Sequence, residues 1–177
     1  LLFRNGDFTV EWFQFRQNNY SGANPRIFSI GTYGIDNGAA LAVSYEGNQI
    51  FTLWINNVAY QYGNLYDLNV SVHMAVTREN GIVRVFRNGI EVFVESMVPN
   101  GPLVDMGDIN SGYDLVFGNE SSNNHTSQYI GYLTNIRWVK GKALYTSNFA
   151  VPTAPLTLTP ETTLLLLAKN AGEAYTD

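Results

Sequence analysis

Two Asn-Gly pairs, Asn80-Gly81 and Asn88-Gly89, divide the segment Val70–Glu95 into three runs rich in β-branched and aromatic residues. Asn-Gly between such runs favours a type I′ turn, because that turn needs positive φ at both central residues and joins two antiparallel strands directly. The spacing therefore predicts a three-stranded antiparallel meander, which is the clearest local unit in the chain.

Short runs of Val, Ile, Phe, Tyr and Thr recur between Gly and Asn elsewhere, and helical periodicity is scarce. A crossover without a central strand is expected at Phe149–Pro160, because Pro cannot donate to a sheet ladder. About a dozen short strands without intervening helices predict an all-β fold, a two-sheet antiparallel β-sandwich. Further strands are expected at Phe8–Phe13, Arg26–Ile30, Ala39–Tyr45, Gln49–Asn56, Tyr113–Gly118, Gln128–Val139 and Thr163–Ala168.

Composition limits the partners. The 177 residues suit one domain, and only 14% are charged, against about 25% in an average domain. The net charge is −5 and the ten Lys and Arg residues are scattered, so nucleic acid is not an expected partner. There is no Cys for a disulfide or zinc site, and the longest apolar stretch, Leu164–Ala168, is far shorter than the roughly 20 residues of a membrane span. The start at Leu1 suggests a processed or partial product.

Three segments carry a family resemblance: FTVEW (Phe8–Trp12), HMAVTRENGIVRVFRNG (His73–Gly89) and GYLTNIRWVKGKALYTSNFAVPTAPL (Gly131–Leu156). They resemble the laminin-G-like and pentraxin-like branch of the concanavalin A-like lectin and glucanase superfamily, in particular the domains of phage tail, large-virus surface and environmental bacterial proteins. The resemblance implies a jelly roll spanning residues 1–177. It leaves the function open, because this superfamily includes lectins, adhesion modules, hydrolases and structural proteins.

Catalytic groups are not evident. Retaining glucanases of the superfamily place two carboxyls about 5 to 5.5 Å apart in an ExDxxE pattern, which is absent here. Glu91 and Glu95 would share a strand face, but roughly 13 Å would separate their Cα atoms, with Phe93 outward between them. His73 is expected to have a hydrogen-bonded structural role and His125 to be exposed. We therefore do not expect an enzyme.

A calcium site is one reading of an acidic loop that contains Gly. Oxygen ligands with flexible spacing suit Ca²⁺, and several laminin-G-like and pentraxin-like relatives bind Ca²⁺ at the rim of the sandwich. The alternative is that these side chains only form Asx-turns, with no cofactor required. The residues are Asp105, Asp108, Asn110 and Asp114.

Carbohydrate binding is predicted for the stretch Trp54–Tyr66, which is rich in aromatic and amide side chains. If alternate residues of Phe51–Ile55 point into the core, Trp54 and Asn56 point outward. The alternative is that Trp54 is covered by a neighbouring loop and that the tyrosines are ordinary strand residues. The candidate sugar-binding residues are Trp54, Asn56, Tyr60 and Tyr62.

Four sequons of the Asn-x-Ser/Thr type suggest N-glycosylation in a secretory pathway or host that supplies it. Some sequons arise by chance in a chain so rich in Asn, Ser and Thr. Two of them, at Asn19 and Asn124, lie in the most loop-like contexts. The four are Asn19, Asn69, Asn119 and Asn124.

The sequence favours a non-catalytic structural or adhesive subunit of an extracellular, cell-surface or virion-surface assembly, with a lectin-like carbohydrate-binding module as the alternative. Only seven residues precede Phe8, where relatives carry a further strand. An incomplete sheet would expose a pairing edge, so we expect a neighbouring copy to donate a strand and build a filament. The alternative is that the strand is supplied within one chain or was not included.

Overall fold

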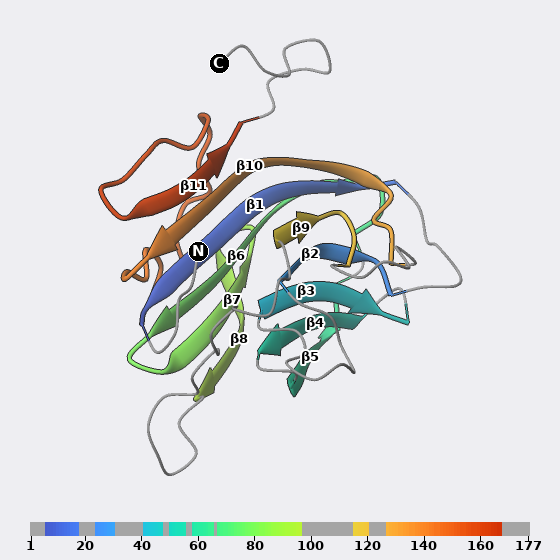
Figure 1. Ribbon diagram of the computed structural model, residues 1–177, viewed down its shortest axis with the longest axis horizontal. Helices are drawn as coiled ribbons and strands as arrows, with labels where there is room; N and C mark the ends of the chain where they lie inside the picture. Colours follow the sequence, from blue (N-terminus) through green and yellow to red (C-terminus); the bar gives the residue numbers. More distant parts are fainter. Residues whose placement is uncertain are drawn as a thin grey trace.

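The computed structural model describes residues 6–17, 24–30, 41–47, 50–55, 58–65, 67–96, 115–120 and 127–167. These residues form eleven strands in two antiparallel sheets and contain no helix (Figure 1). The strands are β1 (Phe8–Arg16), β2 (Arg26–Ile30), β3 (Leu41–Glu46), β4 (Ile50–Ile55), β5 (Val58–Asn64), β6 (Ser71–Glu79), β7 (Ile82–Arg87), β8 (Ile90–Ser96), β9 (Leu115–Phe117), β10 (Gly131–Lys140) and β11 (Thr162–Leu166).

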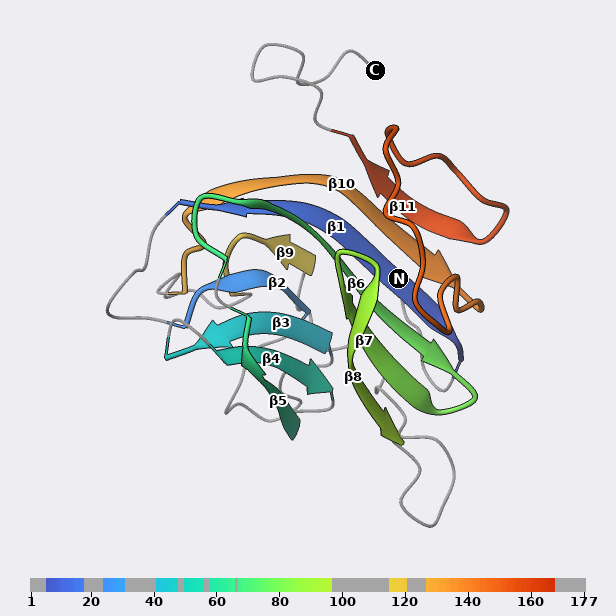
Figure 2. The same ribbon diagram turned by 180° about the vertical axis from the view of Figure 1, so that it is seen from behind.

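The two sheets pack as a sandwich. One has six strands in the order β11-β10-β1-β6-β7-β8, and the other has five in the order β5-β4-β3-β2-β9 (Figures 1 and 2). The described residues include no helix of the length and apolarity that a membrane-spanning helix requires. The predicted all-β sandwich is confirmed.

The meander β6-β7-β8 follows from its two turns. Asn80 and Gly81 have φ of 49° and 82°, and Asn88 and Gly89 have φ of 48° and 74°. Positive φ at both central residues is the signature of the type I′ turn, whose twist matches that of the flanking strands. The turns thus set the registers Glu79↔Ile82 and Arg87↔Ile90 that the Asn-Gly spacing predicts.

The core lies between the sheets and is built around aromatic rings. In β1 the interior side chains are Phe8, Val10 and Trp12, as the period of two requires. The ring of Phe28 in β2 meets Trp12 edge-on at 5.6 Å and Trp138 of β10 at 5.1 Å between centroids. These contacts join the two sheets through edge-to-face pairs, the preferred geometry for aromatic rings.

Bulges in β2 and β8 change which face of the sheet their side chains occupy. Ile27 and Phe28 both lie in the core because the β2–β3 register shifts between Arg26 and Phe28. In β8, Phe93 pairs with Val85 and Glu91 pairs with Phe86. These partners are adjacent in β7, so β8 has one extra residue between Glu91 and Phe93. The expectation that Phe93 points outward is wrong: it packs against the core, and the bulge puts Glu91 on the other face.

A long segment without regular structure, residues 141–161, crosses the outer face of the six-stranded sheet (Figure 2); we call it the outer strap. Hydrogen bonds fix it along its length, from Thr77 Oγ1 to the carbonyl of Tyr145 at 2.8 Å and from the Phe149 amide to the carbonyl of Gly89 at 2.8 Å. It contains the Pro-rich crossover predicted at 149–160. The strap gives this sheet a second buried face.

Candidate functional site

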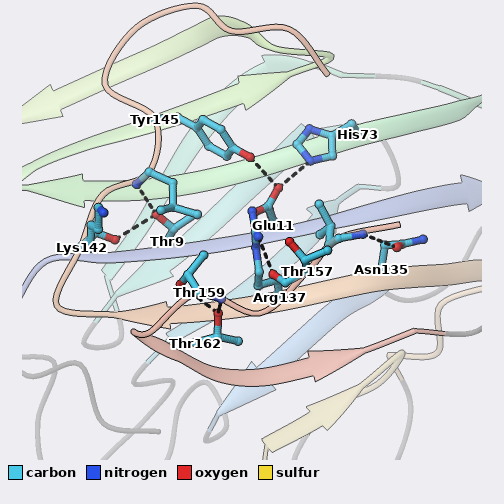
Figure 3. Close-up of polar contacts among 12 residues, drawn as sticks. Thr9, Glu11, His73, Asn135, Arg137, Lys142, Tyr145, Thr157, Thr159 and Thr162 are labelled. Atoms are coloured by element: carbon cyan, nitrogen blue, oxygen red, sulfur yellow. Dashed lines mark hydrogen bonds and ion pairs between the residues drawn. The ribbon is translucent and has the colours of Figure 1, made fainter. Parts of the chain in front are cut away.

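A buried polar network joins the outer strap to the six-stranded sheet (Figure 3). Its centre is Glu11 in β1. Oε2 of Glu11 lies 3.0 Å from His73 Nε2 and accepts a 2.9 Å hydrogen bond from the Tyr145 hydroxyl, while Oε1 accepts a 2.8 Å bond from Arg137 Nε. Arg137 also donates to the carbonyl of Thr157 at 2.8 Å. The network therefore ties both halves of the strap to one carboxylate.

The electrostatics of this network hold Glu11 in its ionised form. Burial by itself raises the pKa of Glu11, but the hydrogen bond from His73 and the charge and hydrogen bonds of Arg137 together lower it below its ordinary value. Burial, followed by the charge of Glu11, raises the pKa of Tyr145, which stays a neutral donor. The side chains of Glu11 and His73 are fully buried. The arrangement secures structure, and the predicted hydrogen-bonded role of His73 is confirmed.

The outer face of the five-stranded sheet carries a different set of side chains, arranged in two rows across its strands. The first row runs Ser29↔Ala42↔Trp54↔Ala59, each residue directly opposite the next. Its members are small except for Trp54. Ser29 and Ala42 are completely buried, Trp54 is 7% exposed and Ala59 is exposed.

The second row is polar and runs Arg26↔Ser44↔Thr52↔Gln61 through the same four strands. Three of its members are buried, and Gln61 is exposed. Hydroxyl, amide and guanidinium groups thus follow one another on a single sheet face. Such groups supply donors and acceptors that a hydroxyl-rich ligand can use.

Trp54 links the two rows. Its indole nitrogen donates to Ser44 Oγ at 2.9 Å, and that hydroxyl in turn donates to Glu46 Oε1 at 2.6 Å. The guanidinium carbon of Arg26 lies 5.7 Å from the centroid of the indole ring, within the range of a cation–π contact. One aromatic ring, one cation and one carboxylate therefore meet around the Ser44 hydroxyl.

Arg26 is the least satisfied of these groups. The residue is 5% exposed, and its Nε and Nη1 atoms are buried without a hydrogen-bond acceptor among the described residues. Burial lowers the pKa of Arg26, while the charges of Glu46 and Glu120 act in the opposite direction. A buried donor without a partner costs about 1–3 kcal/mol, so such a group in a native fold calls for an explanation.

The predicted sugar-binding residues do not share one surface. Trp54 points away from the interior, as predicted, but Tyr60 pairs with Leu53 and packs against the core, and Tyr62 lies in the core against Phe51 and Phe93. The reason is the period of two in β5, which alternates these tyrosines with Ala59 and Gln61. The prediction of one exposed surface containing Tyr60 and Tyr62 is thus wrong, and Asn56 lies outside the described residues.

The other predicted sites are only partly described. Asn69 is exposed in a bend with φ of 56°, and Asn119 is half-buried; their glycosylation stays a prediction. Within the described ranges no group of three or more His, Asp or Glu residues could hold a metal ion. The remaining candidates lie outside those ranges, and these are Asn19, Asn124, Asp105, Asp108, Asn110 and Asp114.

Sequence reasoning missed Arg26, Ser44, Glu46 and Gln61. Alternation places Ser44 and Glu46 on the face opposite Val43 and Tyr45 of the same strand, which is a usable signal. Nothing local shows that Ser44 lies opposite Arg26, because that register depends on a bulge in β2.

A family model described as the concanavalin A-like lectin/glucanases superfamily, of the laminin G type, matches residues 1–145. The chain belongs to this superfamily. No curated protein sequence matches it.

Solved structures with similar folds include proteins of carbohydrate recognition. A candidate carbohydrate-binding protein from Bacteroides ovatus has a TM-score of 0.66 at 15% identity, covering 94% of this chain, which spans only 46% of that protein. The carbohydrate-binding module of a Ruminococcus gnavus sialidase, bound to α2,3-sialyllactose, has a TM-score of 0.60 at 13% identity. The match covers 80% of this chain and 78% of that module. Domain 4 of a Geobacillus stearothermophilus arabinanase, in complex with arabinotriose, has a TM-score of 0.53 at 16% identity. The match covers 80% of this chain and 63% of that domain. At these identities the likeness establishes the fold.

Proposed function

We propose that this domain is a non-catalytic carbohydrate-binding module that acts outside the cell or on a cell or virion surface. The observation that carries the proposal is the outer face of the five-stranded sheet, where Trp54, Arg26, Ser44 and Glu46 converge. Sugar recognition relies on a few oriented polar groups, and on this face the buried indole of Trp54 holds such groups in place. Two of the similar solved structures contain a bound oligosaccharide, which supports the same reading.

Two carboxylates of the six-stranded sheet, Glu11 and Glu91, are engaged in ways that do not suit hydrolysis. Glu11 is fully buried and engaged by Arg137, His73 and Tyr145, so it has no free proton to exchange with a substrate. Glu91 in β8 is paired with Arg84 in the neighbouring strand β7 at 3.3 Å. Glycoside hydrolysis needs two carboxyls that flank one bond, and neither of these residues is placed to do so.

The experiment is an array of immobilised oligosaccharides probed with the intact chain, followed by titration calorimetry on the best ligands. Binding to a defined set of glycans, without release of reducing sugar, is the expected result. Absence of binding across the array would overturn the proposal. Release of reducing sugar that is lost on substituting one carboxylate would overturn the non-catalytic part.

Assembly with other copies is a second candidate, favoured by the edge strand β11. Leu164 and Leu166 of β11 pack against the core, and β11 pairs with β10 on one side only among the described strands. An apolar edge strand is a template for a strand from another chain, and head-to-tail addition would build a filament. Negative-stain microscopy of the purified chain tests this role: filaments support a structural or adhesive subunit, and uniform monomers exclude it.

A further inference from the structure

We propose that the glycan is neutral, and that Arg26 and Glu46 hold two neighbouring hydroxyls of one sugar ring at the end of the five-stranded sheet. This inference rests on the proposed function and names the ligand class and the residues that select it. The observation behind it is the pair of buried guanidinium nitrogens, Nε and Nη1 of Arg26, for which the described part of the chain supplies no acceptor.

Arg26 and Glu46 lie on the same face and at the same end of the sheet. Arg26 begins β2 and stands opposite Ser44, and Glu46 ends β3 two residues further on. The Ser44 hydroxyl donates to Glu46 Oε1 at 2.6 Å, so the carboxylate leans toward the strand position that faces Arg26. A donor pair and an acceptor are thereby placed next to each other across two antiparallel strands.

This end of the sheet is reached from solvent. Asn24 and Gly47, the residues that flank Pro25 and Glu46, are both exposed, and the Gly47 amide donates to Asn24 Oδ1 at 3.0 Å. Glu46 itself is half-buried. A ligand that approaches here meets the half-buried carboxylate first, and it reaches the buried Nε and Nη1 atoms of Arg26 only if the residues that cover them move.

The charges favour a neutral ligand over an acidic one. The positive charge of Arg26 is accompanied by two carboxylates that act on it, Glu46 and Glu120, so these three described groups together carry no excess positive charge for a ligand carboxylate to neutralise. A hydroxyl can accept from the guanidinium, and its neighbour on the same ring can donate to the Glu46 carboxylate. The guanidinium nitrogens and the carboxylate each then gain a hydrogen bond, and no charge is added.

Trp54 is the positioning residue of this site. Its indole nitrogen holds the Ser44 hydroxyl, which orients the Glu46 carboxylate, and its ring lies against the Arg26 guanidinium. The flanking positions, Ala42 and Ala59, are small, so Trp54 is the one large side chain among the four residues of its row. The arrangement fixes donor and acceptor before the ligand arrives, which reduces the ordering cost of binding.

The test compares Arg26→Gln and Glu46→Gln with wild type, using matched probes that differ in charge: lactose against 3′-sialyllactose, arabinotriose against trigalacturonic acid, and the neutral and acidic halves of a glycan array. Arg84→Gln and Glu91→Gln, in the Arg–Glu pair on the other sheet, are the matched controls. We expect binding to neutral glycans, a loss of about tenfold or more in each site variant, and no change in the controls, because one charged hydrogen bond is worth about tenfold in affinity.

Each outcome decides a different point. Tighter binding of the acidic member of a probe pair would show that Arg26 takes a carboxylate, and would overturn the inference. Glycan binding that survives both site substitutions would overturn the inference and leave the proposed function standing. No glycan binding by wild type would overturn both. Thermal melting checks the fold, and if Arg26→Gln does not fold, Glu46→Gln alone decides, since its side chain is half-buried and its shape is conserved.

Discussion

The indole nitrogen of Trp54 donates a 2.9 Å hydrogen bond to Ser44 Oγ on the neighbouring strand. This bond explains how a large aromatic residue on the outer face of a sheet can be 93% buried, given its exposed fraction of 7%. A buried indole N–H needs an acceptor, and the Ser44 hydroxyl supplies it while donating its own hydrogen bond to Glu46. Trp54 is therefore held by the fold as firmly as a core residue.

Replacing Trp54 should accordingly cost stability. We expect Trp54→Ala to lower the free energy of unfolding by about 3–5 kcal/mol, the usual range for a buried Trp. Trp54→Phe and Ser44→Ala should show a coupling of about 0.5–1.5 kcal/mol in a double-mutant cycle, because each removes the same hydrogen bond. Urea unfolding of wild type, Trp54→Ala and the three variants of the cycle measures these effects. A small loss of stability in Trp54→Ala, together with lost glycan binding, would instead make Trp54 an exposed sugar platform.

Local signals account for most of the fold that the sequence predicts. The Asn-Gly turns define the meander because their geometry is set by two adjacent residues, and the strand predicted at Phe8–Phe13 has the alternation that puts Phe8, Val10 and Trp12 in the core. The outward direction of Trp54 follows from the same period of two. Each of these features needs information from only a few neighbouring residues.

Strand registers and bulges account for the features that the sequence could not predict. Tyr60 and Tyr62 face the core because β5 pairs with β4 in a particular register, and no local pattern encodes that choice. The facing of Glu91 depends on a bulge in β8. The candidate site joins Arg26, Ser44 and Trp54 from three strands, so it appears only once the strands are paired.

The buried carboxylate of Glu11 gives a second prediction. Glu11→Gln should lower the free energy of unfolding by about 3–5 kcal/mol, because it leaves the Arg137 guanidinium buried without its counter-charge. Glu91→Gln, in a partly exposed pair with Arg84, is the control and should cost less than about 1 kcal/mol. Equal losses in the two variants would contradict the central role of Glu11.

The pH dependence of this network has a defined sign. The folded pKa of Glu11 is lowered below 4.5, so its stabilising contribution is complete above that pH and is lost as the pH falls through the lowered value. Wild type should therefore lose stability on acidification, and Glu11→Gln should lose less over the same interval. Urea midpoints measured between neutral pH and pH 3 test the difference. Parallel acid profiles for the two proteins would rule this assignment out.

The buried Tyr45 predicts how stability changes at alkaline pH. Burial raises its pKa from 10.0 to about 12, with Gln14 donating a 2.6 Å hydrogen bond to its oxygen. The unfolded chain releases this proton from about pH 10, so stability is complete below that pH and falls by roughly 2–3 kcal/mol as the pH rises to about 12. Tyr45→Phe should show a shallower alkaline decline than wild type in urea unfolding. Tyr129 and Tyr145 also have raised pKa values, so part of the decline should remain.

Gly89 gives the sharpest test of how the outer strap is attached. Its φ is +74°, and a Cβ at this position would lie 2.0 Å from the carbonyl oxygen of Phe149 in the strap. Gly118 has nearly the same φ, +73°, but a Cβ there would meet nothing within 4 Å. Both substitutions to Ala carry the strain of a left-handed residue, about 1–2 kcal/mol. Only Gly89→Ala also pushes against the backbone of the strap.

We therefore expect Gly89→Ala to destabilise the protein well beyond Gly118→Ala, and the excess to come from displacement of the strap. The Phe149 amide donates to the Gly89 carbonyl at 2.8 Å, and the Phe149 ring stacks on Tyr145, whose hydroxyl reaches Glu11. Displacing Phe149 should thus loosen the network beneath it. Hydrogen exchange at the amides of Phe149 and Leu144 should accelerate in Gly89→Ala and stay unchanged in Gly118→Ala. If both variants lose the same stability and keep the same exchange rates, the strap is not held at Gly89.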